Sequence, residues 1–295
     1  MVKILITGAR SFVGESVEAW LSQWPGVYLV DTVDTMGGAW MRADFSQYDV
    51  VFHVAGIAHV DPKPEMAPLY YKVNRDLTAE IAEHAKKQGV RQFVFMSSMI
   101  VYHASKSLKG TIISKNTLPA PNDFYGDSKL QAESELQKLA SSDFHVAILR
   151  PCMIYGPKGK GNFQRLAALA VRTPAFPNWH NRRSMLYIDN LSEFVRQAID
   201  SNLSGIFHLQ NREYADTMEI VRYFARKKGH KLLCSRVFNP LVWLGSFALK
   251  PLCKMFANQY YLPELTTFDF DYQVVSFKDS LDKMAAAENT IPQQS

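Results

Sequence analysis

The sequence has few cysteines and no strong charge bias, and we expect no secretory leader, because it begins with a predicted strand and lacks an apolar signal segment. Its three cysteines, Cys152, Cys234 and Cys253, lack the spacing of a disulfide framework or a metal site. We therefore expect a protein of the reducing cytoplasm with no resident metal. The net charge of +5 comes from scattered basic residues that are not interleaved with aromatic residues. This pattern argues against a nucleic-acid partner.

The sequence also lacks an apolar run long enough to cross a bilayer, so we expect no transmembrane segment. The uncharged stretch from Val237 to Leu249 is too short to span and contains Pro240 and Gly245. We expect it to form a packed helix of a second domain. Contact between residues 237–262 and a membrane surface is the alternative.

Apolar runs alternate with segments of helical period through the first two thirds of the chain. At 295 residues, one main domain with a smaller companion is expected. Alternation of strands and helices predicts an α/β fold with a Rossmann-type doubly wound parallel sheet, followed by a smaller C-terminal α/β substrate domain. We assign residues 1–155 to the dinucleotide-binding domain, to which 183–210 return, and residues 156–182 and 211–295 to the substrate domain.

A glycine-rich turn follows the first predicted strand, Lys3–Thr7, and precedes a segment of helical period. In this context backbone N–H groups and a helix N-terminus bind the pyrophosphate of a dinucleotide. Ser11 stands where a glycine is usual, so the turn must accommodate a small side chain. The residues expected at the pyrophosphate are Gly8, Ser11, Phe12, Val13 and Gly14.

A carboxylate ends the second predicted strand, Val27–Asp34, about 20 residues after Gly14. At that offset Asp34 can accept hydrogen bonds from the adenosine ribose and would repel a 2′-phosphate, which favours NAD over NADP. Asp31 is a near competitor, and either aspartate could be only a turn residue. Asp44 could accept a hydrogen bond from the adenine amine, or it could be a plain loop aspartate.

Further strand ends carry small or polar residues. The third predicted strand ends in Ala55 and Gly56, which lets backbone approach a ligand closely. His53 lies inside this apolar strand, and we expect a core histidine rather than a catalytic one. Ligands of parallel sheets bind at the carboxyl ends of the strands. The residues expected there are Gly8, Ala55, Ser98 and Pro151.

Tyr125 and Lys129 are four residues apart in a predicted helix and therefore share one face. A phenol has an unperturbed pKa near 10, and an adjacent ammonium favours the phenolate. Tyr125 could then exchange a proton with a substrate oxygen that is held by Ser98, at the end of a neighbouring strand. The alternative is a solvated helix face.

Together these motifs resemble the extended short-chain dehydrogenase/reductase family, in its nucleotide-sugar epimerase and reductase branch, over roughly residues 3–210. The matching segments are Thr7–Gly14, His53–Gly56, Asn74 with Thr78, Ser97–Tyr102, Pro121–Lys129, Arg150–Pro151, Tyr155–Pro157 and Arg183–Asn190. Departures are Ser11, and His103 where a glycine often follows the tyrosine.

The resemblance implies roles for individual residues. Tyr125 is the acid/base, while Lys129 lowers its pKa and holds the nicotinamide ribose. Ser98 hydrogen-bonds the sugar oxygen. Arg183 and Asn162 meet the diphosphate of a nucleotide sugar, the alternatives being a surface arginine and a helix cap. The cofactor contacts implied are Asn74, Tyr125, Lys129 and Pro151, besides the residues of the glycine turn.

The implied activity is NAD-dependent 4-epimerisation of a UDP-sugar, of the UDP-glucose or UDP-N-acetylglucosamine type, by transient oxidation at C4. An NAD(P)H-dependent UDP-4-keto-sugar reductase of surface-polysaccharide synthesis is the alternative, and a non-catalytic NAD(P)-sensing protein is a third. Sugar 4,6-dehydratases of this family usually place an Asp-Glu pair where this chain has Met99 and Ile100, so dehydration is disfavoured. By analogy we expect a homodimer through the helices that include Tyr70–Gln88 and Tyr125–Leu139.

Overall fold

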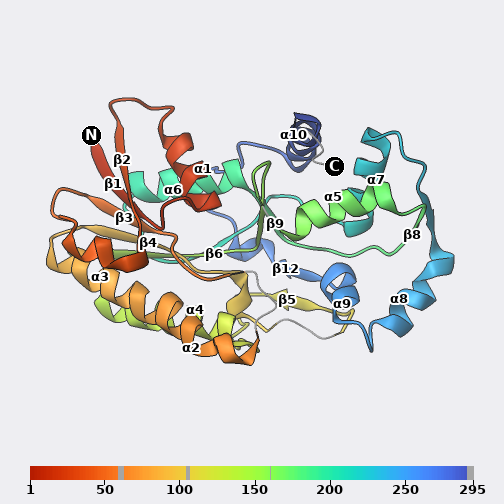
Figure 1. Ribbon diagram of the computed structural model, residues 1–295, viewed down its shortest axis with the longest axis horizontal. Helices are drawn as coiled ribbons and strands as arrows, with labels where there is room; N and C mark the ends of the chain where they lie inside the picture. The colour runs from red at the N-terminus through yellow and green to blue at the C-terminus, as the bar shows by residue number, and fades with distance from the viewer. Residues whose placement is uncertain (59–62, 104–106, 160, 291–295) are drawn as a thin grey trace.

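Six parallel strands form the central sheet, in the order β10-β6-β4-β3-β1-β2 (Figure 1). The computed structural model describes residues 1–295 apart from 59–62, 104–106, 160 and 291–295. The strands are β1 (Val2–Thr7), β2 (Tyr28–Val33), β3 (Val50–His53), β4 (Gln92–Met96), β6 (His145–Pro151) and β10 (Gly205–Leu209). The predicted doubly wound parallel sheet is confirmed.

Helices cover both faces of this sheet (Figure 1). On one face lie α1 (Phe12–Leu21) and α6 (Ile188–Asp200). On the other lie α2 (Ala67–Tyr71), the π-helical turn η3 (Lys72–Asp76), α3 (Leu77–Lys87) and α4 (Phe124–Leu139). Two 3₁₀ turns, η1 (Met36–Arg42) and η2 (Pro64–Met66), lie in the connections. We call the six strands with α1–α4 and α6 the sheet half.

The strands of the sheet half are apolar on both faces, as strands buried between two helical layers must be. Successive residues of β1 enter opposite cores: Ile4 packs towards α1 and α6, and Leu5 towards α3 and α4. Thr7, at the end of β1, lies opposite Val33 of β2 and His53 of β3. The carboxyl ends of neighbouring strands therefore meet along one edge.

Smaller elements extend the core that lies under α1 and α6. The short strands pair in parallel as β5 (Thr111–Ile113) with β12 (Gln259–Tyr261), β7 (Met153–Tyr155) with β9 (Met185–Tyr187), and β8 (Ala175–Pro177) with β11 (Leu233–Ser235). The helices are α5 (Asn162–Arg172), α7 (Thr217–Lys227), α8 (Asn239–Gly245), α9 (Lys250–Phe256) and α10 (Phe277–Thr290). The 3₁₀ turns are η4 (Met99–Val101), η5 (Arg236–Phe238) and η6 (Pro263–Leu265).

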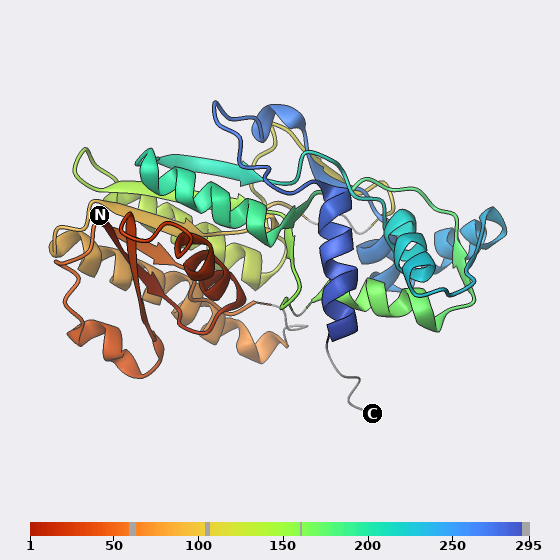
Figure 2. The same ribbon diagram turned by 90° about the horizontal axis from the view of Figure 1, so that it is seen from above.

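We call residues 161–181 and 211–262 the C-terminal lobe. It lies beside the sheet half, with α10 between the two, as seen from above in Figure 2. Lys283 of α10 forms an ion pair with Asp189 of α6 at 2.9 Å, and Asp282 forms one with Lys227 of α7 at 2.5 Å. Helix α10 thus bridges the two parts. The residue boundaries of the two predicted domains stay a prediction.

The prediction of a packed helix over Val237–Leu249 is wrong. The helix in this stretch, α8, has seven residues, and of these only Val242 is buried. Trp243 and Leu244 are more than half exposed. The uncharged sequence therefore forms surface instead of core. Among the described residues, none of the helices has the length and apolarity that a membrane span requires.

Candidate active site

The glycine turn after β1 requires glycine at its first position. Gly8 has φ +103°, and a Cβ there would come 2.7 Å from the backbone nitrogen of Ala55. The ends of β1 and β3 can therefore approach this closely only without a side chain. Ser11 has φ −81°, an ordinary conformation for serine, and its Oγ accepts a hydrogen bond from Gly14 N at 3.0 Å. Serine thus fits as the N-cap of α1.

The first turn of α1 also reaches the loop after β7. A Cβ on Gly156 would lie 3.0 Å from the ring of Phe12. Val13 is partly buried against the core of the α1 face. The predicted pyrophosphate residues therefore form one continuous turn at the end of β1, backed by this loop.

Of the three candidate aspartates, Asp34 lies beside the glycine turn. It accepts hydrogen bonds from Arg10 at 3.2 Å and from Met36 N at 2.9 Å. The Met36 N–H, followed by Arg10, holds the pKa of Asp34 below its ordinary value. Asp31 instead accepts a hydrogen bond from Tyr48 at 3.0 Å. Asp44 is exposed and accepts hydrogen bonds from the backbone and hydroxyl of Ser46 in a turn.

Arg10 was not among the predicted site residues, because the prediction of NAD depended on the carboxylate of Asp34 alone. Arg10 has φ +65°, unusual for a residue with a side chain. Its guanidinium lies next to the carboxylate expected at the adenosine ribose. A cation at this position weakens the sequence-based argument against NADP, since it can accommodate a 2′-phosphate.

Asn74 fixes the backbone that follows β3. Its amide accepts a hydrogen bond from Ile57 N at 2.8 Å and donates to Ile57 O at 3.1 Å and to Ser128 of α4 at 3.1 Å. Asn74 lies in the π-helical turn η3, a local widening that often marks functional sites. A Cβ on Gly56 would come 3.0 Å from Asn74 Oδ1 and 3.1 Å from Lys129 Nζ. Glycine thus lets both groups come close to the strand end.

His53 is a core residue, as predicted. Its ring nitrogens form hydrogen bonds with Thr7 Oγ1 at 2.6 Å and Thr78 Oγ1 at 3.0 Å. Burial, assisted by the charge of Lys129, lowers the pKa of His53 to about 3. The ring is therefore neutral at physiological pH.

Lys129 is buried beneath the strand ends. Its ammonium donates to Met96 O at 2.9 Å and lies 4.7 Å from the centroid of the Phe95 ring. Burial lowers the pKa of Lys129 to about 8, and the charge of Glu133 opposes this shift. A buried amine that is held by one carbonyl retains N–H groups that can bind a further oxygen.

Tyr125 lies at the start of α4, next to Ser98. Asp123 caps the helix by accepting a hydrogen bond from Gly126 N at 2.7 Å. A Cβ on Gly126 would come 2.5 Å from Ile100 O, so glycine allows α4 to approach the turn that carries Ser98. The Tyr125 ring packs edge-on against Tyr70, with centroids 5.9 Å apart.

In the protein without cofactor or substrate, Lys129 does not lower the pKa of Tyr125, contrary to the expectation from the sequence. Burial raises the pKa of Tyr125 to about 12, and a hydrogen bond from Ser98 opposes the rise. The physical reason is that the ammonium of Lys129 is directed to Met96 O. The phenol is thus protonated at neutral pH and is positioned by Ser98.

A buried ionic network below Ser98 was also missed. Arg150 forms an ion pair with Glu133 at 2.5 Å and donates to Tyr102 OH at 2.7 Å. Ser97, the neighbour of Ser98, bonds to the same carboxylate. Glu133 lies one turn after Lys129 in α4, and this i, i+4 spacing was the available signal. The network holds the end of β4 against α4.

The two predicted diphosphate residues lie outside the sheet half. Arg183 donates to Lys254 O at 2.6 Å and, at 3.4 Å each, to Ala257 O and Gln259 Oε1. The neighbouring Asn181 donates to Met255 O at 3.0 Å and to Ala257 O at 3.2 Å. Arg183 is therefore tied to the end of α9 and is not a free surface arginine.

Arg183 also lies near the end of β6. Burial lowers the pKa of Arg183, and the charge that Cys152 can carry opposes this shift. Cys152 follows Pro151, which closes β6. Asn162 is exposed as the first residue of α5, whose N-cap is Gly161. The helix-cap alternative for Asn162 is therefore wrong.

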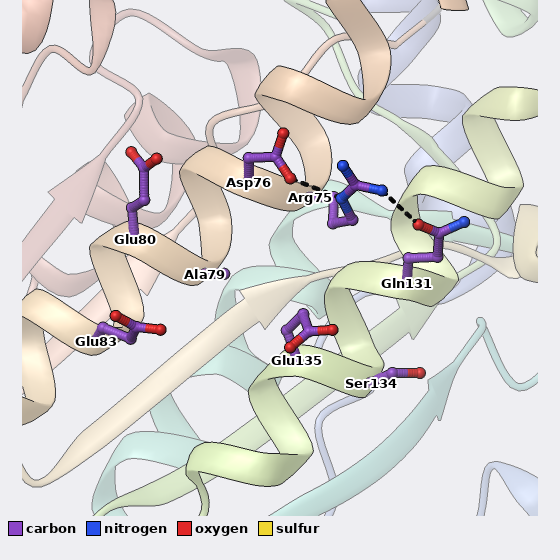
Figure 3. A pocket seen from close by; sticks show the side chains of 8 residues that line it. All are labelled: Arg75, Asp76, Ala79, Glu80, Glu83, Gln131, Ser134 and Glu135. Carbon is purple, nitrogen blue, oxygen red and sulfur yellow. Dashed lines mark hydrogen bonds and ion pairs between the residues drawn. The ribbon is translucent and has the colours of Figure 1, made fainter. Parts of the chain in front are cut away.

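An open groove of about 500 Å³ lies between α3 and α4, away from the strand ends (Figure 3). Four carboxylates line it, those of Asp76, Glu80, Glu83 and Glu135, and Arg75 donates to Asp76 at 2.6 Å. This face belongs to the two helices predicted to form a dimer interface. Its lining is polar apart from Ala79. The homodimer stays a prediction.

One set of described residues could provide metal ligands. His180 and Asp216 are 2.6 Å apart, with Glu219 close by. Asp216 already caps α7 by accepting from Met218 N at 2.9 Å. The set lies in the C-terminal lobe and has no counterpart among the predicted site residues.

The NAD dependent epimerase/dehydratase family has a sequence model that matches residues 4–208. The chain therefore belongs to this family, and the resemblance inferred from the motifs is confirmed. Over 184 residues, 60% of this chain and 56% of the relative, it is 35% identical to a UDP-glucose 4-epimerase of Vibrio cholerae. Over 220 residues it is 26% identical to the N-acetyl-alpha-D-glucosaminyl-diphospho-ditrans,octacis-undecaprenol 4-epimerase of Escherichia coli O157:H7, covering 72% of this chain and 65% of the relative. The chain thus aligns with less than two thirds of either relative.

A solved structure resembles the whole chain. The UDP-glucuronic acid 4-epimerase of Bacillus cereus, in complex with NAD, superposes with a TM-score of 0.73 over 98% of this chain and 99% of that one. At 20% identity this likeness supports the fold. The residues present also fit a dinucleotide. Gly8 lets the ends of β1 and β3 meet without a side chain between them, and the buried amine of Lys129 lies beside Gly56 at the adjacent strand end.

Proposed function

We propose that this chain is an NAD-dependent 4-epimerase of a UDP-sugar of the glucose or N-acetylglucosamine type. The observation that carries the proposal is the contact between Ser98 and Tyr125 beside the buried Lys129. Ser98 follows β4, and helix α4 brings Tyr125 beside Ser98 and Lys129 beside Gly56, at the strand ends where dinucleotides bind in doubly wound sheets. Membership of the NAD dependent epimerase/dehydratase family supports NAD as the cofactor.

In the proposed site each group has a defined task. Bound NAD supplies a hydride acceptor and donor. Gly8, with the first turn of α1, receives the pyrophosphate, and Asp34 receives the adenosine ribose. Lys129 orients the nicotinamide side through its remaining N–H groups, while Asn74 fixes the backbone after β3 beside it. Arg183 and Asn162 hold the diphosphate of the substrate, so that the sugar lies between Ser98 and Tyr125.

Proton transfer is assigned to Tyr125. Ser98 holds the C4 oxygen of the sugar, and Tyr125 takes the hydroxyl proton as C4 is oxidised, then returns it after the 4-keto sugar has turned. Burial alone keeps the phenol protonated, with a pKa of about 12. A positively charged nicotinamide beside the phenol would lower this pKa, because an opposite charge favours the phenolate. Tyr125 would then be able to accept a proton at neutral pH only when the oxidised cofactor is bound.

The alternative is a reductase that delivers the hydride once to a UDP-4-keto sugar. Tyr125 would then only donate its proton, which its high pKa favours. The observation that supports a reductase is the position of Arg10 beside Asp34, because an arginine there can bind the 2′-phosphate of NADPH.

A second question concerns the carrier of the sugar. The Vibrio relative is named for a nucleotide sugar, and the Escherichia relative for an undecaprenol-linked one. Both carriers join the sugar through a diphosphate, so Arg183 and Asn162 would serve either. The exposed apolar helix α8 is the observation that supports a lipid carrier as the second candidate.

The test is turnover without added reduced cofactor. Purified protein should interconvert UDP-glucose with UDP-galactose, or the N-acetylated pair, as followed by proton NMR of the anomeric region. Tyr125→Phe should lower turnover by about 10²–10⁴-fold, the usual contribution of a general acid/base, while NAD binding persists. Tyr71→Phe is the matched control, because its hydroxyl bonds to Asp127 and not to Ser98. Stoichiometric NAD(P)H consumption would select the reductase, and NAD binding without turnover of any substrate would select a sensor.

A further inference from the structure

The outer helix of the C-terminal lobe presents an unusual apolar surface. Eighteen large apolar side chains of the described residues are exposed, and six of them fall within residues 237–249. These six are between 55% and 78% exposed. We call them the α8 surface: Val237, Leu241, Trp243, Leu244, Phe247 and Leu249. Figure 1 shows α8 at the outer edge of the molecule, at the opposite end from β2.

The α8 surface has the composition of an interfacial element. Its seven-residue helix is uncharged, and the rings of Trp243 and Phe247 pack edge-on with centroids 5.1 Å apart. Both rings are more than half exposed. Tryptophan and phenylalanine of this kind concentrate at the boundary between lipid headgroups and acyl chains. One apolar contact anchors the helix, through the buried Val242.

The segment of the chain that contains this surface is rich in positive charge. Residues 220–263 contain eight lysines and arginines and no aspartate or glutamate, although the whole chain carries only +5. Arg236 precedes the helix, and Lys250 and Lys254 follow it. Lys227 is neutralised within the protein by Asp282. Basic residues on both sides of an exposed apolar helix are the pattern that binds anionic lipid surfaces.

Charge also distinguishes between possible occupants of the surface. A second copy of the chain, related by a two-fold axis, would bring these basic segments towards each other, and like charges repel. An acidic phospholipid bilayer complements the cations and the apolar rings together. The same argument favours a bilayer over burial in a neutral protein groove.

We propose that the α8 surface docks the C-terminal lobe on an anionic lipid bilayer. Trp243 and Phe247 enter the headgroup region, and the exposed Arg236 and Lys254 on either side of the helix contact lipid phosphates. This docking does not rest on the proposed reaction, since it uses none of the site residues. The lobe that docks is nevertheless the one that holds Arg183, through Lys254 O of α9. The predicted diphosphate site therefore belongs to the docked part of the molecule.

The experiment is sedimentation of the full chain with vesicles. Vesicles of phosphatidylcholine with one quarter phosphatidylglycerol should carry the protein into the pellet, whereas pure phosphatidylcholine vesicles should carry at least tenfold less. Raising the salt concentration should release it, because exposed charges are screened. The double variant Trp243→Ser/Phe247→Ser should lose at least tenfold in vesicle affinity. Leu118→Ser is the matched control, since Leu118 is 81% exposed outside the α8 surface.

A second readout keeps the proposal falsifiable if the double variant folds poorly. Brominated lipid should quench part of the wild-type tryptophan fluorescence, and Trp243→Phe should remove that part while vesicle binding persists. Wild-type protein that stays in the supernatant with anionic vesicles would overturn the proposal. So would equal losses in the double variant and Leu118→Ser. A dimer that is dispersed by the double variant, without vesicle binding, would assign the surface to a second copy.

Discussion

The sheet half and the C-terminal lobe hold their functional side chains in different ways. In the sheet half Asn74, Lys129 and Glu133 are buried and bound to other groups, as Asn74 is to Ile57 and Glu133 to Arg150. Arg183, by contrast, is held against the lobe by the Lys254 carbonyl of α9, and the neighbouring helix α8 is exposed. The comparison suggests that changes in the sheet half disturb stability and function together. Changes in the lobe should affect function with little loss of stability.

The largest expected loss of stability comes from the ionic network. Glu133→Gln leaves Arg150 buried without its carboxylate, so the free energy of unfolding should fall by about 3–5 kcal/mol. Glu135→Gln, in the exposed pair with Lys138, should cost no more than about 1 kcal/mol. Urea unfolding of both variants measures the difference. Equal losses would mean that burial does not distinguish the two pairs.

Substitution of Gly8 should reduce stability less and should also weaken NAD binding. Gly8→Ala should lose about 1–2 kcal/mol from its positive φ, and its Cβ should displace Ala55. NAD affinity, measured by calorimetry, should drop at least about tenfold. Gly26→Ala is the control, because Gly26 also has a positive φ but nothing lies within 4 Å of its Cβ position. Comparable loss of NAD binding in both variants would contradict a specific need for the close approach of Gly8 to Ala55.

Acid sensitivity should come from His53. Its folded pKa is about 3 because of burial, below the unfolded value near 6.5. Between these values the unfolded chain binds a proton that the folded chain does not, so stability falls as pH falls below 6.5. The slope contributed is at most about 1.4 kcal/mol per pH unit. His53→Asn should remove this part of the slope between pH 6.5 and 5, whereas His145→Asn, whose ring bonds to Ser142 O at the surface, should keep it. An unchanged slope in His53→Asn would show that another group is responsible.

The smallest change in stability is expected at Arg183, which is held against the lobe through α9. Arg183→Lys keeps the charge but loses the planar fork that binds two oxygens. Unfolding free energy should change by no more than about 1 kcal/mol, while KM for the sugar nucleotide rises about tenfold at nearly constant kcat. Steady-state kinetics with a urea titration would separate the two. A large loss of unfolding free energy in Arg183→Lys would contradict the proposed difference between the sheet half and the lobe.

Much of the sheet half could be predicted from the sequence, because local patterns specify it. Strand, glycine turn and helix are contiguous between Val2 and Leu21. The spacing of Tyr125 and Lys129 follows from helical geometry alone. His53 could be assigned to the core because it lies inside an apolar run.

The rest depends on contacts between distant residues. Arg10 meets Asp34 across 24 positions, and Arg150 meets Tyr102 across 48. The direction of the Lys129 ammonium is set by Met96 O, 33 positions away. The exposure of α8 could not be read from its composition, because an uncharged apolar segment fits a core or a surface equally well. Only the surroundings in the fold decide which.

The attachment of Arg183 to α9 has a mechanical consequence. Lys254 O and Ala257 O hold its guanidinium, and Met255 O and Ala257 O hold Asn181. Helix α9 follows α8 after a short connection. A displacement of α8 is therefore passed to Arg183 through the backbone carbonyls of α9. A displacement of this kind would change how Arg183 binds the substrate diphosphate in the proposed site. The proton transfer proposed for Tyr125 would not change. Enzyme seated on vesicles should then differ from free enzyme in KM, with kcat conserved.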